Sequence, residues 1–352
     1  MTSPFIKLIF CLSLGLGTTL TFLSSHWLIA WAGLEISTLA ILPLMAQHHH
    51  PRASEAATKY LLIQASATGL LLFATAFNAW MEASWNIVQI KDPIAISLII
   101  LALALKMGLA PFHFWLPEVM QGLDLTTGLI LSTWQKLAPF VLLMQISHTA
   151  QPALLLTIGI ASTALAGWAG LNQTQLRKIL AYSSTTHLGW MVIVVQFAPH
   201  LAVLALGIYI FMTMAAFLTL KEVSSTKINE FTLSWSKSPV KMTMMTLVLL
   251  SLAGLPPLTG FLVKWYILEE LTKQEMAVPA TVIVMSALIS LYFYVRLCYF
   301  AIISVFPNMT KTKMTWRRKN KQDKIVLATV TSAAITLLPL APIIMALILL
   351  YA

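Results

Sequence analysis

The chain has 352 residues, of which 59% are hydrophobic and only 10% are charged. A soluble domain carries about 25% charged residues and about 45–50% apolar ones, so a soluble globular fold is excluded. The 22 Lys and Arg residues outnumber the 12 Asp and Glu residues and give a net charge of +10. In so apolar a chain, this excess indicates basic loops on one side of a membrane rather than a nucleic-acid partner.

Long apolar runs predict an all-α polytopic membrane protein with about eleven transmembrane helices. Each run is long enough to cross a hydrocarbon core of about 30 Å. The runs are continuous, whereas the strands of a membrane β-barrel alternate in segments of about ten residues. In chain order, the predicted spans are 3–23, 26–46, 56–80, 94–121, 125–146, 152–171, 175–197, 199–221, 241–268, 277–303 and 325–350.

The positive charges favour one orientation of these spans. If the N-terminus is inside, most of the 22 Lys and Arg residues fall in inside segments, and only Lys91 and Lys273 fall in outside segments. Lys and Arg crowd the inside loops of membrane proteins. The asymmetry therefore predicts an inside N-terminus and, with an odd number of spans, an outside C-terminus.

Two predicted spans, the fourth and the ninth, carry prolines in the middle. The fourth contains Gly108-Leu109-Ala110-Pro111 and the ninth contains Gly254-Leu255-Pro256-Pro257. Because proline lacks an amide donor and clashes with the preceding turn, each span is expected to be a broken helix. Each break frees backbone carbonyls one turn earlier, at Met107 in one span and at Leu252 and Ala253 in the other, and these can hold water within the membrane.

The matching positions of the two breaks predict an internal repeat. Spans that lie five apart in the chain cross the membrane in opposite directions, so the fourth and ninth spans would be related by inversion. We therefore expect inverted five-helix repeats at roughly 1–146 and 152–303, with an extra C-terminal helix at 325–350. Interrupted helices at corresponding positions of two halves indicate an ion or substrate site near the middle of the membrane.

Four ionisable residues lie deep in predicted spans, namely Glu35, Lys106, Lys136 and Lys264. A charge near the bilayer centre costs about 2.5–3.5 kcal/mol on insertion scales, and such residues usually line a path or pair with one another. Burial weakens the hold of an ammonium on its proton, and a nearby carboxylate restores it. A Glu35–Lys106 pair would thus act as a proton switch, with Lys136 and Lys264 passing the proton onward. The alternative is that these side chains snorkel to the membrane surface or are satisfied in the core, and it fits Lys264 best.

Two histidines extend the candidate proton path, because histidine titrates near neutral pH. His113 lies two residues after Pro111, and His187 ends the polar stretch Ser183-Ser184-Thr185-Thr186-His187 within a predicted span. In the expected repeat, His187 is roughly the counterpart of Glu35. The alternative is that each histidine only hydrogen-bonds across helices.

No metal or redox-cofactor site is predicted in this chain. Cys11 and Cys298 lie in separate apolar segments, which excludes a CxxC pair, a zinc cluster and an iron–sulfur site. The chain has no GxGxxG motif after a strand and no Walker A loop. His48-His49-His50 are expected in a solvated loop, because adjacent histidines cannot converge on one ion in regular structure.

The segments around the two breaks resemble the hallmark motifs of the antiporter-like subunits of respiratory complex I. These segments are Leu105–Glu118 (LKMGLAPFHFWLPE) and Leu255–Trp265 (LPPLTGFLVKW), and the resemblance extends over the full chain. It implies two inverted five-helix bundles whose fourth and ninth helices are broken. It also implies a hydrated mid-membrane proton path along the residues that match the family's, which are Glu35, Lys106, Lys136 and Lys264.

The same resemblance implies a location and partners. The chain would be a multi-pass protein of the mitochondrial inner membrane, with its N-terminus on the matrix side and its C-terminus on the intermembrane-space side. It would assemble with the other membrane-arm and accessory subunits, which bind NADH, FMN, iron–sulfur clusters and ubiquinone, and would itself hold no cofactor. Lipids, cardiolipin included, are candidate partners of the basic segment 311–324, with a solvated loop as the alternative.

Two other classes of function compete with a proton-translocating subunit of a redox complex. A free-standing cation/proton antiporter should carry its own cation-binding carboxylates in mid-membrane, and only Glu35 is available. A structural membrane scaffold would not need three buried lysines and two helix breaks in inverted positions. The sequence therefore favours a proton-translocating subunit of a redox complex, and the resemblance implies that the coupled electron transfer runs from NADH to ubiquinone.

Overall fold

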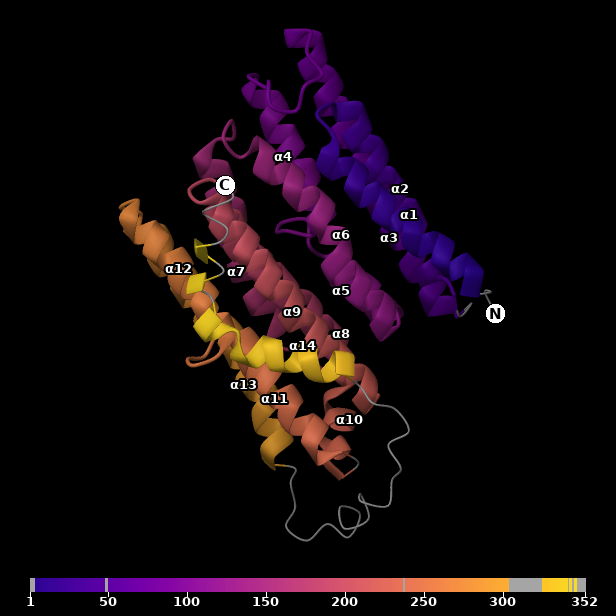
Figure 1. Ribbon diagram of the computed structural model, residues 1–352, viewed down its shortest axis with the longest axis vertical. Coiled ribbons are helices and arrows are strands. Elements are labelled where there is room, and N and C mark those ends of the chain that lie inside the picture. The colour runs from indigo at the N-terminus through magenta and orange to yellow at the C-terminus, as the bar shows by residue number, and fades with distance from the viewer. Residues whose placement is uncertain are drawn as a thin grey trace. The chain divides into compact units, whose positions relative to one another are not determined.

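The computed structural model of the chain describes residues 4–47, 50–236, 238–303 and 325–346, apart from 341 and 344. These residues form helices joined by short connections, and no strand occurs among them (Figure 1). Within the described ranges, seven helices are long and apolar enough to cross a membrane. The predicted all-α membrane fold is confirmed. Residues 48, 49 and 311–324, for which the sequence predicted solvated or lipid-binding loops, lie outside the described residues.

The chain divides into two compact units, unit 1 (Met1–Ser162) and unit 2 (Thr163–Ala352). The helices of unit 1 are α1 (Pro4–Leu23), α2 (Trp27–Met45), α3 (Pro51–Glu82), α4 (Pro93–Met107), α5 (Trp115–Gly122), α6 (Leu125–Ile146) and the start of α7 (Pro152–Gly170). Helices α1 and α2 pack at two glycines, since a Cβ on Gly17 would lie 2.7 Å from the Gly33 carbonyl oxygen. Small residues of this kind let helix backbones approach closely within a membrane.

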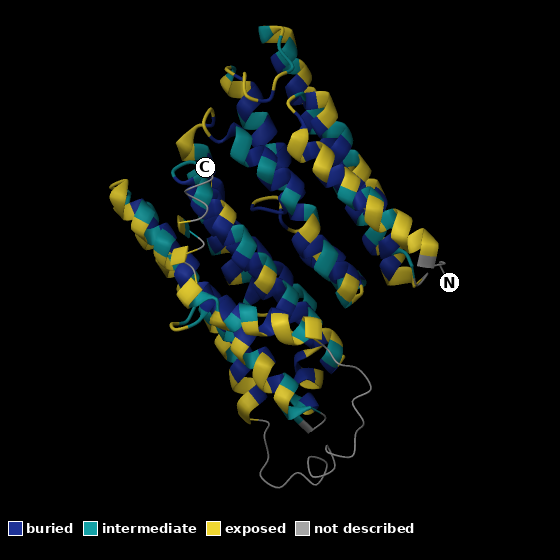
Figure 2. Ribbon diagram, in the orientation of Figure 1, coloured by how far each residue is buried: buried dark blue, intermediate teal, exposed yellow. Residues whose placement is uncertain are grey.

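Helix α3 buries one narrow stripe of its surface inside unit 1. The stripe recurs every three or four residues, the helical period, and consists of Ala53, Ala56, Tyr60, Gln64, Ala67, Thr68, Leu71, Ala74, Thr75 and Asn78. Outside the stripe, Leu62 and Phe73 are exposed, as are large apolar side chains on most described helices. Figure 2 shows exposed positions, in yellow, recurring along the helices of both units. The stripe thus places hydroxyl and amide groups in the interior, while apolar groups face outward.

The helices of unit 2 are the rest of α7, α8 (Leu176–Val195), α9 (Pro199–Val223), α10 (Ile228–Leu233), α11 (Pro239–Ala253), α12 (Thr259–Lys273), α13 (Ala277–Ile303) and α14 (Ile325–Thr336), with 3₁₀ turns at Ser234–Ser236 and Leu338–Leu340. Nearly every residue of α8 is buried. A helix that is covered on all sides is a core helix. The polar stretch that ends at His187 therefore lies inside unit 2.

The fourth and ninth predicted spans are both broken, as the sequence predicted. Helix α4 ends at Met107 and α5 begins at Trp115, while α11 ends at Ala253 and α12 begins at Thr259. Each first half-helix is followed by a glycine in the left-handed conformation, with φ of 76° at Gly108 and 78° at Gly254. Glycine adopts this conformation without the steric penalty of a Cβ atom, which makes it the usual end of a helix.

The predicted C-terminal span 325–350 is interrupted in the structure, and residues 342, 343, 345 and 346 beyond the interruption are helical again. Helix α14 stops at Thr336, and a 3₁₀ turn follows at Leu338–Leu340. Pro339 lies in this turn. Proline has no amide donor and disfavours helical geometry at the residue before it, so the helix does not run on through this point.

Candidate functional site

Lys106 and Lys136 line one small cavity inside unit 1, which we call the lysine cavity. Lys106 lies in the last turn of α4 and Lys136 lies in the middle of α6, and they are 6% and 3% exposed. The cavity has a volume of about 10 Å³, close to the room that one water molecule needs. The structure thus brings two of the predicted residues together at one buried place.

Polar side chains from three helices surround the two lysines. They are Ser37, Thr38, Tyr60, Gln64 and Gln135. The Gln135 amide donates a hydrogen bond of 2.9 Å to the Ser37 carbonyl oxygen, which joins α6 to α2. This bond holds the Gln135 side chain in place in the cavity wall, beside both lysines.

The end of α4 is closed by a residue from the other side of its break. The Trp115 indole N–H, at the start of α5, donates a hydrogen bond of 3.1 Å to the Leu105 carbonyl oxygen. The last carbonyls of a helix lack partners within the helix. The Leu105 carbonyl accepts from the Gly108 amide at 3.2 Å as well as from Trp115. Because Trp115 also lines the lysine cavity, the break and the cavity share a wall.

The Lys106 ammonium makes no hydrogen bond with any described residue. Glu35 interacts electrostatically with both Lys106 and Tyr60. The Glu35 carboxylate accepts a hydrogen bond of 3.3 Å from the Thr38 hydroxyl. In this conformation Glu35 therefore influences Lys106 across space, without a hydrogen-bonded ion pair between them.

His113 lies in the break between α4 and α5 and is 2% exposed. Its ring centroid is 4.4 Å from that of Phe114. His113 is not among the residues that line the lysine cavity. It is thus a buried residue of the same break as Lys106, set apart from the cavity itself.

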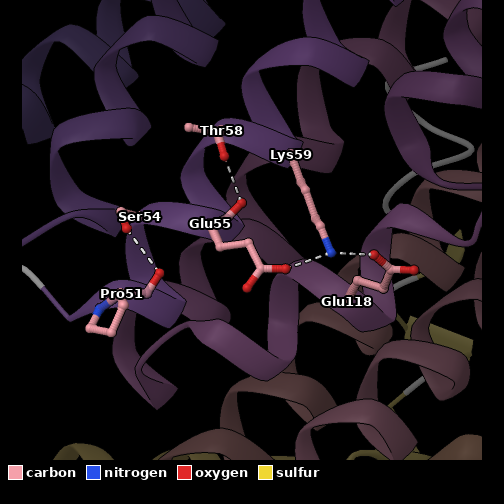
Figure 3. Close-up of polar contacts among 6 residues, drawn as sticks. All are labelled: Pro51, Ser54, Glu55, Thr58, Lys59 and Glu118. Carbon is pink, nitrogen blue, oxygen red and sulfur yellow. Dashed lines mark hydrogen bonds and ion pairs between the residues drawn. The ribbon is translucent and has the colours of Figure 1, made fainter.

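An ion-pair cluster outside the cavity links α5 to α3. Lys59 Nζ lies 2.9 Å from a carboxylate oxygen of Glu55 and 2.9 Å from one of Glu118 (Figure 3). Exposed ion pairs contribute little to stability, so close packing carries more of the attachment. A Cβ on Gly122 would lie 2.5 Å from the Arg52 carbonyl oxygen, which shows how near the two backbones are.

In unit 2, Lys264 points back to the break rather than along α12 toward its end. Lys264 Nζ donates a hydrogen bond of 2.7 Å to the Ala253 carbonyl oxygen, one of the two carbonyls that the prolines were expected to free. It also lies 6.0 Å from the centroid of the Trp190 ring. A cation over an aromatic face is stabilised by the ring quadrupole. The lysine is therefore held at the broken part of the span.

His187 lies on α8 and is 8% exposed, with its ring centroid 5.8 Å from that of Tyr209 on α9. It precedes Trp190 by three residues, so the two are neighbours on the surface of α8. The hydroxyls of the polar stretch each donate to the carbonyl three residues earlier, at 2.7–2.8 Å. These donors are used within the helix, and only acceptor lone pairs remain for neighbouring groups.

Sequence reasoning missed several residues of these sites, namely Tyr60, Gln64, Trp115, Gln135 and Trp190. A signal for two of them exists, because Tyr60 and Gln64 are polar residues four apart within one predicted span. That spacing places them on one face of a helix. Which face of α3 is buried depends on packing, so the signal alone does not locate the cavity.

Two family models match consecutive parts of the chain. The model described as NADH:quinone oxidoreductase/Mrp antiporter, TM, matches residues 24–290, and the model described as NADH dehydrogenase subunit 2 C-terminus matches residues 291–345. The chain is 59% identical to the NADH-ubiquinone oxidoreductase chain 2 of Carassius auratus over 345 residues, which are 98% of this chain and 99% of the relative. The protein of the same name from Danio rerio is 57% identical over 343 residues, 97% of this chain and 99% of the relative.

Solved structures share the fold. A chain of respiratory complex I from Thermus thermophilus with bound aureothin is similar with a TM-score of 0.85 and 24% identity, over 98% of this chain and 81% of that one. A chain of the Mrp complex from Dietzia sp. DQ12-45-1b is similar with a TM-score of 0.74 and 16% identity, over 97% and 73%. At these identities the likeness concerns the fold alone.

Proposed function

The chain belongs to the NADH-ubiquinone oxidoreductase chain 2 family, and from this membership we propose that Glu35, Lys106, Lys136 and Lys264 carry protons through a membrane subunit of respiratory complex I. The chain is a subunit of the proton-translocating NADH:ubiquinone oxidoreductase of the mitochondrial inner membrane. NADH, FMN, iron–sulfur clusters and ubiquinone belong to other subunits of the complex, and this chain contributes proton transfer.

The shared position of Lys106 and Lys136 is the observation that carries this proposal. Both side chains line one buried cavity that has room for about one water molecule. Two ammonium groups in an apolar interior are costly, and they repel each other when both are charged. If the two lysines hold only one proton between them, this repulsion is avoided. The passage of that proton from one amine to the other, directly or through water, is a transfer step.

Glu35 controls this step from outside the cavity. Its electrostatic interaction reaches Lys106, whose ammonium makes no hydrogen bond to the described residues. An approach of the carboxylate stabilises the charged ammonium, and a retreat favours release of the proton toward Lys136. His113, buried in the neighbouring break, is the proposed relay between the cavity and the region around α5.

Lys264 and His187 have the corresponding role in unit 2. The hydrogen bond from Lys264 to the Ala253 carbonyl stabilises the charged ammonium, because the C-terminal end of a helix carries partial negative charge. His187 lies on α8 beside Trp190, which the ammonium faces. Lys264 would thus hold a proton until the break rearranges, and His187 would be the next acceptor.

The inverted repeat and the orientation in the membrane are part of the same proposal. Residues 1–146 and 152–303 would form the two repeats, with the N-terminus on the matrix side and the C-terminus on the intermembrane-space side. The matched left-handed glycines at the two breaks and the crowding of basic residues on one side support this arrangement.

Replacement of Lys136 by Met tests the proposed path. In complex I reconstituted into liposomes, K136M should assemble normally but lower both proton uptake and coupled NADH oxidation. The exposed Lys91 serves as the matched control, and K91M should keep both rates. Full proton flux in assembled K136M complex would remove Lys136 from the path.

Purification separates this function from that of a free-standing antiporter. The chain should co-purify with a flavin-containing assembly that oxidises NADH. If it is isolated alone and exchanges cations for protons in liposomes, the assignment to complex I is wrong.

A further inference from the structure

An open pocket in unit 2 lies where several membrane-crossing helices end. Its volume is about 770 Å³, and its walls come from the connection before α8, from the start of α10 and from the last turns of α13. None of its residues belongs to the proposed proton path. We call it the basic pocket, after Lys227 and Arg296 in its walls.

A pair of backbone hydrogen bonds gives the basic pocket a firm floor. The Leu176 amide donates to the Thr226 carbonyl oxygen at 3.1 Å, and the Ile228 amide donates to the Thr174 carbonyl oxygen at 3.2 Å. These bonds flank the antiparallel bridge between Gln175 and Lys227. Two segments far apart in the chain are thus joined side by side, and both contribute residues to the pocket.

Among the described residues, the lining of the pocket carries two positive charges and no acidic side chain. The Arg296 guanidinium donates to the Leu171 carbonyl oxygen and lies 5.6 Å from the centroid of the Phe300 ring. The nearby Glu230 carboxylate accepts hydrogen bonds from the Thr226 amide at 2.8 Å and from the Thr226 hydroxyl at 2.9 Å. Glu230 thus binds the backbone of the turn, its Lys227 amide included, and its charge interacts with Lys227, while Arg296 makes its contacts with Leu171 and Phe300.

The lining combines hydrogen-bond donors with an apolar side. Side-chain donors occur at Gln175, Asn229 and Thr232, and the apolar side is formed by Phe300 and Ile303. The apolar side continues along α13, where Ile302 is 62% and Ile303 is 58% exposed. In a chain that spans a membrane, such a surface faces lipid.

We propose that the basic pocket binds the phosphate of an anionic phospholipid, whose acyl chains lie on the exposed apolar face of α13. Guanidinium and ammonium groups bind phosphate oxygens by charge-assisted hydrogen bonds, and a pocket at the end of the spans is at headgroup depth. A zwitterionic headgroup fits less well, because the described lining residues include no carboxylate for its cation, and the Arg296 guanidinium already lies over the Phe300 ring.

Photo-labelling tests this site in the assembled complex. Complex I in nanodiscs of phosphatidylcholine would receive a small fraction of photoactivatable phosphatidylglycerol, and peptides of α13 would be quantified by mass spectrometry. Labelling should fall about five-fold in K227Q, since one basic residue near a membrane surface contributes a factor of this size. K227R should restore labelling, and K221Q, which removes an exposed lysine outside the pocket, should leave it unchanged.

Two further arms identify the ligand. A photoactivatable phosphatidylcholine should label α13 no more in the native chain than in K227Q, and excess inorganic phosphate should not displace the phosphatidylglycerol probe. Equal labelling of the native and K227Q chains by phosphatidylglycerol overturns the site. Displacement by inorganic phosphate overturns the lipid assignment and makes the pocket a site for soluble phosphate.

Discussion

Lys264 Nζ donates a hydrogen bond of 2.7 Å to the Ala253 carbonyl oxygen, so a lysine of α12 closes the end of α11 across the helix break. In unit 1 the neutral Trp115 indole N–H donates a hydrogen bond of 3.1 Å to the Leu105 carbonyl oxygen at the end of α4. The two breaks thus share a left-handed glycine but differ in the charge of the closing group. The charged cap in unit 2 agrees with the proposal that Lys264 holds a proton at the break. The neutral cap in unit 1 leaves Lys106 and Lys136 in the separate lysine cavity.

Replacement of Gly254 by Ala should disturb the Lys264 cap. Gly254 has φ of 78°, and a Cβ there would lie 2.9 Å from both Cδ and Nζ of Lys264. The left-handed conformation alone should destabilise the protein by about 1–2 kcal/mol, and displacement of the ammonium should lower proton flux. Thermal unfolding and proton uptake of the purified complex measure the two effects.

Gly207 provides the matched control for Gly254. A Cβ at Gly207 meets nothing within 4 Å, and alanine is favoured over glycine in a helix by about 1 kcal/mol. G207A should therefore keep or raise stability and leave proton flux unchanged. Equal behaviour of G254A and G207A would contradict a role for the cap.

Replacement of Lys106 by Met should separate stability from function. The buried ammonium has no hydrogen-bond partner among the described residues, and a buried polar group without a partner costs about 1–3 kcal/mol. K106M should thus retain or gain stability by up to about this amount while proton flux is lost. The exposed Lys59 is the control, because K59M breaks ion pairs without reaching the cavity. A strongly destabilised K106M complex with normal flux would make Lys106 a structural residue.

The electrostatic interaction between Glu35 and Lys106 predicts non-additive mutants. E35Q and K106M each remove one end of the interaction, so the double mutant should lose less flux than the two single losses combined. Interacting residues show coupling energies of about 0.5–3 kcal/mol, here obtained from the logarithms of the four coupled rates. The pair of E35Q with K91M should be additive. Additive losses for E35Q and K106M as well would rule out the proposed switch.

The turn before α10 should depend on pH through Glu230. Hydrogen bonds from the Thr226 amide and hydroxyl hold the pKa of the Glu230 carboxyl below its ordinary value. A depressed carboxylate pKa stabilises the fold above the pKa of the unfolded chain, and this stabilisation is lost as the pH falls through the folded value. Amide exchange of residues 224–234, corrected for intrinsic rates, should accelerate in acid. E230Q should remove this pH dependence, and an unchanged acid response in E230Q would assign it to another group.

Much of the fold could be predicted because the decisive signals are local. Apolar runs of about 20 residues require spanning helices, since the bilayer core offers the backbone no hydrogen-bond partners. At each break a glycine that can end a helix is followed within three residues by a proline that cannot continue it, so both breaks could be placed within a few residues. The buried positions of Lys106 and Lys136 follow from their distance to the ends of their spans.

Which residues meet in each site depends on contacts between helices that are distant in the sequence, and the local sequence does not specify these contacts. Tyr60 and Gln64 reach the lysine cavity because packing turns one stripe of α3 inward, and Gln135 joins them from a helix about 70 residues later in the chain. The sequence left two destinations for Lys264, the membrane surface or the break. A long flexible side chain reaches either, and only the folded chain brings the unpaired Ala253 carbonyl within 2.7 Å of its ammonium.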